Sequence, residues 1–161
     1  LALRAKAERK HEARRRAALR RKERELLVAH GRRLAEQGIH PNSVDARTCG
    51  LVGMGRGAIM EERVLRLLNK SRPMPFWLHG GRAASKQEDC AGVDLYAMTD
   101  QGPLPIQVKA SRPRDKRARM SRDKVRALGG VMIIAPPEED DAVIWGRVLG
   151  ALIRAREERG L

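Results

Sequence analysis

Residues 2–36 leave the backbone little alternative to a helix. They contain no proline and a single glycine, Gly31, and consist mostly of Ala, Leu, Arg, Lys and Glu, which all favour helices. Residues 1–40 hold 13 Lys or Arg and 5 Asp or Glu, a net charge of +8. The sequence therefore predicts a basic helical arm over residues 1–40, with Arg15 and Arg16 contacting nucleic acid. A solvated helix is one alternative, and a coiled-coil seam is another, because leucines recur at nearly seven-residue spacing.

The whole chain of 161 residues carries a formal charge of +14, which indicates an anionic partner rather than any one fold. Nucleic acid is the expected partner, because neutralising its phosphates releases counterions. Aromatic residues make up 2% of the chain, too few for the stacking platforms of single-strand and RNA binders. No membrane partner is expected, since the sequence does not show an aromatic or leucine-rich amphipathic face. We therefore expect the chain to bind double-stranded DNA.

The location of the protein is predicted from segments that the sequence lacks. No stretch approaches 18 consecutive apolar residues, and no charged segment followed by an apolar one marks a secretory signal. Two cysteines, Cys49 and Cys90, are too few for a disulfide framework or a four-thiolate zinc site. These features predict a cytoplasmic protein, associated with the nucleoid or, if viral, present in the infected host cell.

A second unit is expected over residues 47–161, where helical and strand patterns alternate. The turn at residues 101–103 predicts that the strands on either side form an antiparallel hairpin. The whole pattern is typical of an α/β fold with a mixed sheet flanked by helices. The expected elements are a helix (58–68, after three glycines), strands (76–79, 92–98 and 104–109), a helix (119–128), strands (131–135 and 142–145) and a helix (147–158).

Four polar side chains interrupt the apolar pattern of this unit. Glu61 lies on the first expected helix, and Asp94 lies among apolar residues of a strand. Gln107 and Lys109 are separated by Val108 on the next strand, so both point to the same face. In an antiparallel hairpin this face lies beside Asp94. The sequence therefore predicts that a carboxylate, an amide oxygen and an ammonium group meet at one place on the sheet.

This set of groups suits phosphodiester hydrolysis. Mg²⁺ binds carboxylate and carbonyl oxygens, polarises a phosphoryl group and lowers the pKa of a bound water. Asp94 is the expected central metal ligand, and the Gln107 side chain and the Val108 carbonyl are expected to add oxygens. Glu61 is expected to reach in from the helix, and Lys109 to orient the attacking water or stabilise developing charge. Mn²⁺ should substitute for Mg²⁺ at this site.

The same residues resemble the PD-(D/E)XK nuclease superfamily, through Glu61, Gly92-Val93-Asp94 and Gln107-Val108-Lys109. The pattern is more similar to the archaeal-type Holliday junction resolvases. In that branch a basic residue and a glycine open the helix that carries the first acid, as in Arg56-Gly57-Ala58-Ile59-Met60-Glu61. The resemblance covers residues 55–146 and implies a restriction-endonuclease-like core. It also implies a homodimer that makes paired symmetric nicks in four-way DNA junctions.

The chain departs from the family pattern at Gln107, where the family has Glu. A neutral ligand should hold a metal less tightly, and Glu88 or Asp89 in the preceding loop is a candidate to compensate. Ser85 and Lys86 stand where the resolvase branch commonly has a Ser-Lys pair, and we expect them to contact DNA.

A second basic segment follows the strand that carries Lys109 and is expected to bind DNA phosphates. Val143, Trp145 and the last helix are candidates for a dimer interface. The residues expected to contact DNA outside the arm are Arg56, Ser85, Lys86, Arg112, Arg114, Lys116, Arg117 and Arg119.

Two other functions remain open from the residues. One is a repair or restriction-type nuclease with the same core, which acts on duplex, flap or lesion DNA. The other is a non-catalytic nucleic-acid-binding protein on a degenerate core, for which Gln107 is the main argument. Substrate preference would separate the first from a resolvase, and metal-independent binding without cleavage would identify the second.

Overall fold

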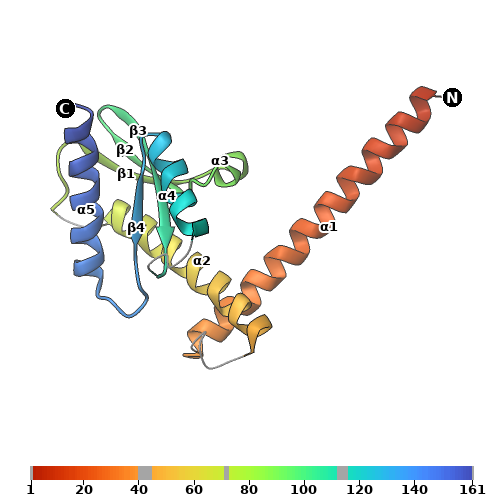
Figure 1. Cartoon of the computed structure of the whole chain (residues 1–161), viewed down its shortest axis with the longest axis horizontal. Helices are drawn as coiled ribbons and strands as arrows, with labels where there is room; N and C mark the ends of the chain where they lie inside the picture. The colour runs from red at the N-terminus through yellow and green to blue at the C-terminus, as the bar shows by residue number, and fades with distance from the viewer. Residues whose placement is uncertain (1, 40–44, 71–72, 112–115, 161) are drawn as a thin grey trace. The chain divides into compact units, whose positions relative to one another are not determined.

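The computed structural model describes residues 2–39, 45–70, 73–111 and 116–160, so the expected linker residues 41–43 lie outside the described part. The elements of the chain, labelled in Figure 1, are α1 (Ala2–Glu36), α2 (Ala46–Lys70), β1 (Leu78–Ala83), α3 (Lys86–Cys90), β2 (Leu95–Thr99), β3 (Gly102–Lys109), α4 (Lys116–Ala127), β4 (Val131–Ile134) and α5 (Asp141–Glu158).

The chain forms two compact units, Leu1–Arg56 and Gly57–Leu161. The first unit contains the long helix that the sequence predicts, because α1 runs for 35 residues. Leu19 and Leu26 on this helix are 61% and 64% exposed, so their spacing does not bury a seam within this chain. Across the described residues, no helix is both long and apolar enough to cross a membrane.

Within the first unit, α1 and α2 cross closely at two glycines. Gly31 and Gly55 are both buried. A Cβ on Gly31 would collide with the backbone of Leu51, and a Cβ on Gly55 would collide with the backbone of Gly31 and Arg32. Only residues without a Cβ allow the two backbones to come this close.

The start of α2 corrects the sequence interpretation, in which three glycines precede a helix that begins at Ala58. The helix begins at Ala46 and includes these glycines. Asp45 lies at its start, where Oδ1 accepts from the N–H groups of Arg47 and Thr48 at 3.0 and 3.1 Å. The Thr48 hydroxyl donates to Oδ2 at 2.7 Å, and this bond is the main reason why the pKa of Asp45 is lowered. This cap and the packing against α1 outweigh the low helix propensity of glycine.

The second unit contains one four-stranded mixed sheet in the order β1-β2-β3-β4. The first two pairs of strands are antiparallel, and β3 and β4 are parallel. Leu95 pairs with Ile106, which confirms the predicted hairpin. Gln107 pairs with Met132. The expected fold class is therefore confirmed as a mixed α/β fold with helices that flank a mixed sheet and a helix at the N-terminus.

The first strand differs from the expected strand at residues 76–79. It runs through Gly80 and Gly81, which were expected to end it, and Gly80 has a φ of 115°. Asn69 of α2 holds this segment, because its Oδ1 accepts from the N–H of Gly81 at 3.0 Å and its Nδ2 donates to the Gly81 carbonyl at 3.2 Å. A register shift between Leu78 and Gly81 lets the glycines enter the strand.

Helices cover both faces of the sheet (Figure 1). α2 and α5 share one hydrophobic core with Ile106 and Val108 of β3. Since side chains alternate along a strand, Gln107 and Lys109 lie on the opposite face, as predicted. α4 contacts β3 and β4 on that side. Residues that represent the core are Met60, Leu68, Leu95, Leu104, Ile133, Ile144 and Leu152.

The last helix corrects the expected strand at residues 142–145. These residues belong to α5, which runs as one helix of 18 residues. Ile144, Val148 and Leu152 are buried at helical spacing, so the apolar run is part of a helix stripe. Asp140 lies at the N-cap position. A short apolar run does not distinguish a buried strand from one side of a helix.

Two arginines hold the segment that joins β4 to α5. Arg63 donates to the carbonyl oxygens of Pro137 and Glu139 at 3.1 and 2.6 Å. Arg147 donates to the Glu139 carboxylate at 2.6 and 3.0 Å and also to the Ile134 carbonyl. These bonds fix the start of α5 against α2 and β4.

Candidate active site

The backbone of Asp94 is fixed at the start of β2. Its N–H donates to the carbonyl of Ile106 on β3 at 2.9 Å, and its carbonyl accepts from the N–H of Ala84, just after β1, at 3.0 Å. Gly92, two residues earlier, has a φ of 89°, a conformation that residues with a side chain rarely adopt. Asp94 is therefore held from both sides at the point where the chain enters the sheet.

The Asp94 carboxylate reaches β3. Its Oδ2 accepts from the backbone N–H of Val108 at 2.7 Å. The pKa of Asp94 is raised, chiefly because burial disfavours the charged form, while the Val108 N–H and the positive charge of Lys109 act in the opposite direction. The structure thus brings Asp94, Val108 and Lys109 together, as the sequence predicts.

Gln107 lies next to this group and is almost fully buried. It is 4% exposed, and its Oε1 is buried with no hydrogen-bond partner among the described residues. Its Nε2 lies 3.6 Å from the position that a Cβ on Gly92 would take, so the side chain extends toward the turn that leads into β2. A buried amide oxygen without a partner is costly, and a cation ligated there would satisfy it.

The backbone of Val108 adds a further oxygen on this side. The N–H and the C=O of one strand residue point to the same edge of the strand. Since the Val108 N–H donates to Asp94, the Val108 carbonyl is also directed to the edge where Asp94 lies. The oxygens available there are thus a carboxylate, a side-chain amide and a backbone carbonyl, all hard ligands of the kind that Mg²⁺ and Mn²⁺ accept.

Glu88 is one of the two acids expected to compensate for Gln107. Its carboxylate already accepts hydrogen bonds from Ser85 and Arg82. Ser85 caps α3, since its hydroxyl accepts from the Glu88 N–H at 3.4 Å and its own N–H donates to the Glu88 carboxylate at 2.6 Å. Arg82 donates two hydrogen bonds to the same carboxylate at 3.0 and 3.1 Å. These bonds, those from Arg82 most strongly, lower the pKa of Glu88 to about 2.

The other acid, Asp89, acts on Asp94. Its side chain is exposed, and its negative charge is one of the causes that raise the pKa of Asp94. Only Asp89 of the two acids is therefore positioned to add a carboxylate near Asp94. The helix α3 itself was missed in the sequence, although Ser85 and Glu88 have the Ser-x-x-Glu spacing of a capping box.

Glu61 lies on α2, partly exposed, and takes part in an interaction of its own. It is next to Met60 and one turn before Val64, which are both in the core, so it lies beside the helix stripe that faces the sheet. Within the described ranges, no group of three or more His, Cys, Asp or Glu side chains is close enough to hold a metal ion. Glu61 therefore does not form such a group with Asp94 and Asp89, and its expected role at the metal stays a prediction.

The residues expected to contact DNA are distributed over several elements. Arg15 and Arg16 are exposed on α1, where Arg16 pairs with Glu12 at 2.5 Å. Arg56 on α2 is partly buried and engaged in another interaction. Lys86 is exposed in the first turn of α3 rather than in a loop. Arg112 and Arg114 lie outside the described residues, and Lys116, Arg117 and Arg119 belong to α4 but have side chains outside the described part.

Comparison of the chain with protein-family models, with curated proteins and with solved structures found no match.

Proposed function

We propose that the chain is a Mg²⁺-dependent DNA endonuclease with a restriction-endonuclease-like core, and that four-way junctions are its substrate. The observation that carries the proposal is the meeting of Asp94, Gln107 and Lys109 on one side of the β2–β3 hairpin. The Asp94 carboxylate contacts the Val108 N–H at 2.7 Å, and the Gln107 oxygen beside it is buried without a partner among the described residues. An acid and a lysine stand here at the positions that the sequence pattern requires, and Gln107 stands where the pattern has Glu.

The groups present fit a hard divalent cation. Asp94, the Gln107 Oε1 and the Val108 carbonyl would hold the ion, and Asp89 would add negative charge near it. A bound Mg²⁺ or Mn²⁺ polarises a phosphoryl group and lowers the pKa of a bound water. The raised pKa of Asp94 is consistent with this role, because a cation would offset the cost of the buried charge.

Lys109 supplies a positive charge that does not depend on a metal. Its ammonium acts electrostatically on Asp94, so it lies close enough to the same place to influence charge there. At a phosphodiester it would stabilise the negative charge that develops on the phosphoryl oxygens.

The charge of the chain supports DNA as the substrate. A formal charge of +14 with 2% aromatic residues favours contacts to the backbone of a duplex over base stacking. A homodimer that nicks two strands symmetrically is part of the proposal. On α5, Val143 is 51% exposed and available for an interface, whereas Trp145 packs in part against the core.

A non-catalytic nucleic-acid-binding protein is the second candidate. It is favoured by the neutral side chain of Gln107 and by the bond between Asp94 and Val108, which also stabilises the hairpin without any metal. A repair or restriction-type nuclease on the same core is the third candidate, because it would use the same residues on duplex or flap DNA.

The test is cleavage of an end-labelled four-way junction beside a linear duplex of matched sequence, with Mg²⁺ and with EDTA. The wild type is compared with Asp94→Asn, and Asp123→Asn serves as the control because its carboxylate is 69% exposed on α4. Paired nicks in the junction alone, which EDTA and Asp94→Asn abolish and Asp123→Asn preserves, are the expected result. Cleavage of both substrates would favour a nuclease without junction specificity over a resolvase. Tight binding without cleavage in Mg²⁺ would favour the non-catalytic binding protein.

A further inference from the structure

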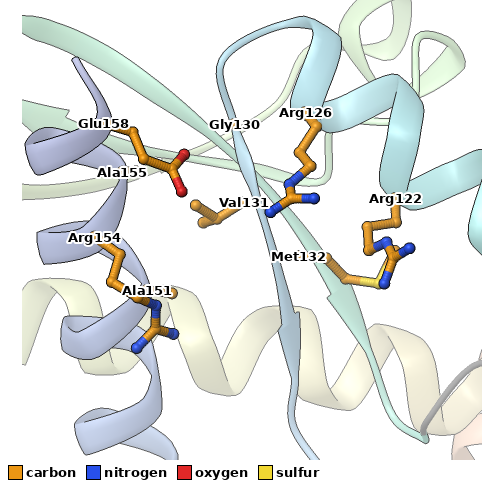
Figure 2. A pocket seen from close by; sticks show the side chains of 9 residues that line it. All are labelled: Arg122, Arg126, Gly130, Val131, Met132, Ala151, Arg154, Ala155 and Glu158. Carbon is orange, nitrogen blue, oxygen red and sulfur yellow. The ribbon is translucent and has the colours of Figure 1, made fainter.

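A groove runs along the outer edge of β4, between α4 and α5 (Figure 2). It has a volume of about 190 Å³. Arg122 and Arg126 extend toward it from α4, Arg154 and Glu158 line it from α5, and Met132 lines it from β4. The strand β4 is the last in the sheet order, so the groove follows a sheet edge rather than a gap between strands.

The lining of the groove carries more positive than negative charge. Its lining holds three guanidinium groups and one carboxylate. In the described part of the chain, neither Arg126 nor Arg154 forms an ion pair, and Arg122 only approaches the exposed Asp123 at 3.9 Å. Like charges that share a small concave site repel one another. An anion bound among them would remove this repulsion.

The strand β4 directs one backbone donor to the side of the groove. The N–H of Ala135 donates to Lys109 on β3 at 2.8 Å. Backbone groups of successive strand residues point to opposite edges, so the N–H of Met132 is directed to the outer edge. The remaining lining consists of Val131 and of three residues with little or no side chain, namely Gly130, Ala151 and Ala155.

We propose that this groove binds phosphodiester groups of a nucleic-acid backbone, held by Arg122 and Arg126 on one wall and by Arg154 on the other. Guanidinium groups bind phosphate oxygens through two parallel hydrogen bonds, which suits a site built from arginine rather than lysine. The lining contains no aromatic ring on which a base could stack. An added β-strand is the other occupant of an open edge, but charged side chains on an edge oppose strand pairing. In addition, Arg147 donates to the Ile134 carbonyl, so this carbonyl on the outer edge is not available to an added strand.

This inference rests on the proposed function, which identifies the polyanion as DNA. It extends the DNA-binding surface beyond the candidate active site. Met132 in the groove pairs directly with Gln107. Neighbouring strands lie about 4.8 Å apart, so the groove is one strand away from Gln107. The groove therefore lies near enough to the candidate active site for one DNA molecule to contact both.

The test measures DNA binding in EDTA, so that it does not depend on cleavage. The full chain is titrated with a fluorescent four-way junction and with a linear duplex over a series of salt concentrations. The groove variant Arg126→Ala with Arg154→Ala is compared with Lys70→Ala with Lys124→Ala. Both double variants lower the charge from +14 by two, and both control lysines are exposed outside the groove lining. Circular dichroism confirms that each variant is folded.

We expect the groove variant to weaken binding by more than about tenfold at 0.1 M salt and to reduce the slope of log K against log salt by about 1.8, which is 0.9 for each lost phosphate contact. The control variant should keep the wild-type slope. Glu158→Gln, which removes the only carboxylate in the lining, should tighten binding. An equal loss of DNA affinity in both double variants, or no loss in either, would refute the proposal that the groove binds phosphates.

The outcomes also separate this inference from the proposed function. A wild-type salt slope in the groove variant, together with cleavage that Asp94→Asn abolishes, would refute phosphate binding in the groove and support the nuclease. A reduced salt slope in the groove variant, together with a wild type that cuts no DNA, would support phosphate binding in the groove and refute the nuclease. A change in the oligomeric state of the groove variant by sedimentation, without a change in DNA binding, would identify a second copy of the chain as the occupant and overturn the inference.

Discussion

The replacement Asp94→Asn should stabilise the metal-free protein, and Asp94→Ala should be less stable than Asp94→Asn. The folded state raises the pKa of Asp94, so the ionised carboxylate lowers stability at neutral pH. Asparagine removes the charge and keeps an oxygen that accepts from the Val108 N–H, which now lies 2.7 Å from Oδ2. Alanine leaves this N–H on a buried strand without its acceptor, at a cost of about 1–3 kcal/mol. At about 2–4 °C per kcal/mol for a chain of this size, the two variants should differ in Tm by roughly 2–12 °C.

Thermal unfolding in EDTA, followed by circular dichroism from pH 7 down to pH 3, measures this difference. A carboxyl group with a raised folded-state pKa contributes stability at low pH that is lost as the pH rises through that pKa. The advantage of Asp94→Asn over the wild type should therefore be present at neutral pH and vanish in acid. Asp123→Asn, with an exposed carboxylate, should shift Tm little. Equal losses of Tm in the Asn and Ala variants at pH 7 would refute the reasoning about the buried charge.

Three further predictions follow from other parts of the chain. Deletion of residues 1–37 should flatten the salt dependence of DNA binding, measured by fluorescence anisotropy, while Mg²⁺-dependent cleavage is retained; an unchanged slope would show that the arm does not contact phosphates. Gln107→Glu should lower Tm in EDTA, because it buries a charge, and should increase the rise in Tm that Mg²⁺ causes; a smaller rise would argue against a metal at this position. Gly55→Ala should cost about 1–3 kcal/mol because its Cβ meets the backbone of Gly31, and helix content against temperature measures this, with Gly57→Ala as the control that meets no atom within 4 Å.

The hairpin and its polar residues could be predicted because their signals are local. Alternation along β3 and the short turn before it are enough to place Gln107 and Lys109 on one face beside Asp94, and the observed pairing of Leu95 with Ile106 agrees. The burial of Gln107 to 4% exposure could not be predicted, because burial depends on tertiary packing that the local pattern of one strand does not show.

The errors arose where tertiary contacts decide the local structure. The apolar run at residues 142–145 contains β-branched residues and suits a strand, but the stripe from Ile144 to Leu152 packs into the core as a helix. The glycines before Ala58 suggest a loop, but Gly55 is needed inside a helix by its close approach to α1. The role of Asp89 near Asp94 depends on a five-residue helix that is too short to show a hydrophobic period.

The close crossing of α1 and α2 also limits how this sequence can diverge. A mutation at Gly31 or at Gly55 that adds even one methyl group must be accompanied by a shift of backbone atoms, because the obstructing atoms belong to the main chain and not to a flexible side chain. Surface positions on α1 carry no such restriction. In descendants of this chain the two glycines, 24 positions apart in the printed sequence, should therefore persist as the mark of a shared helix pair.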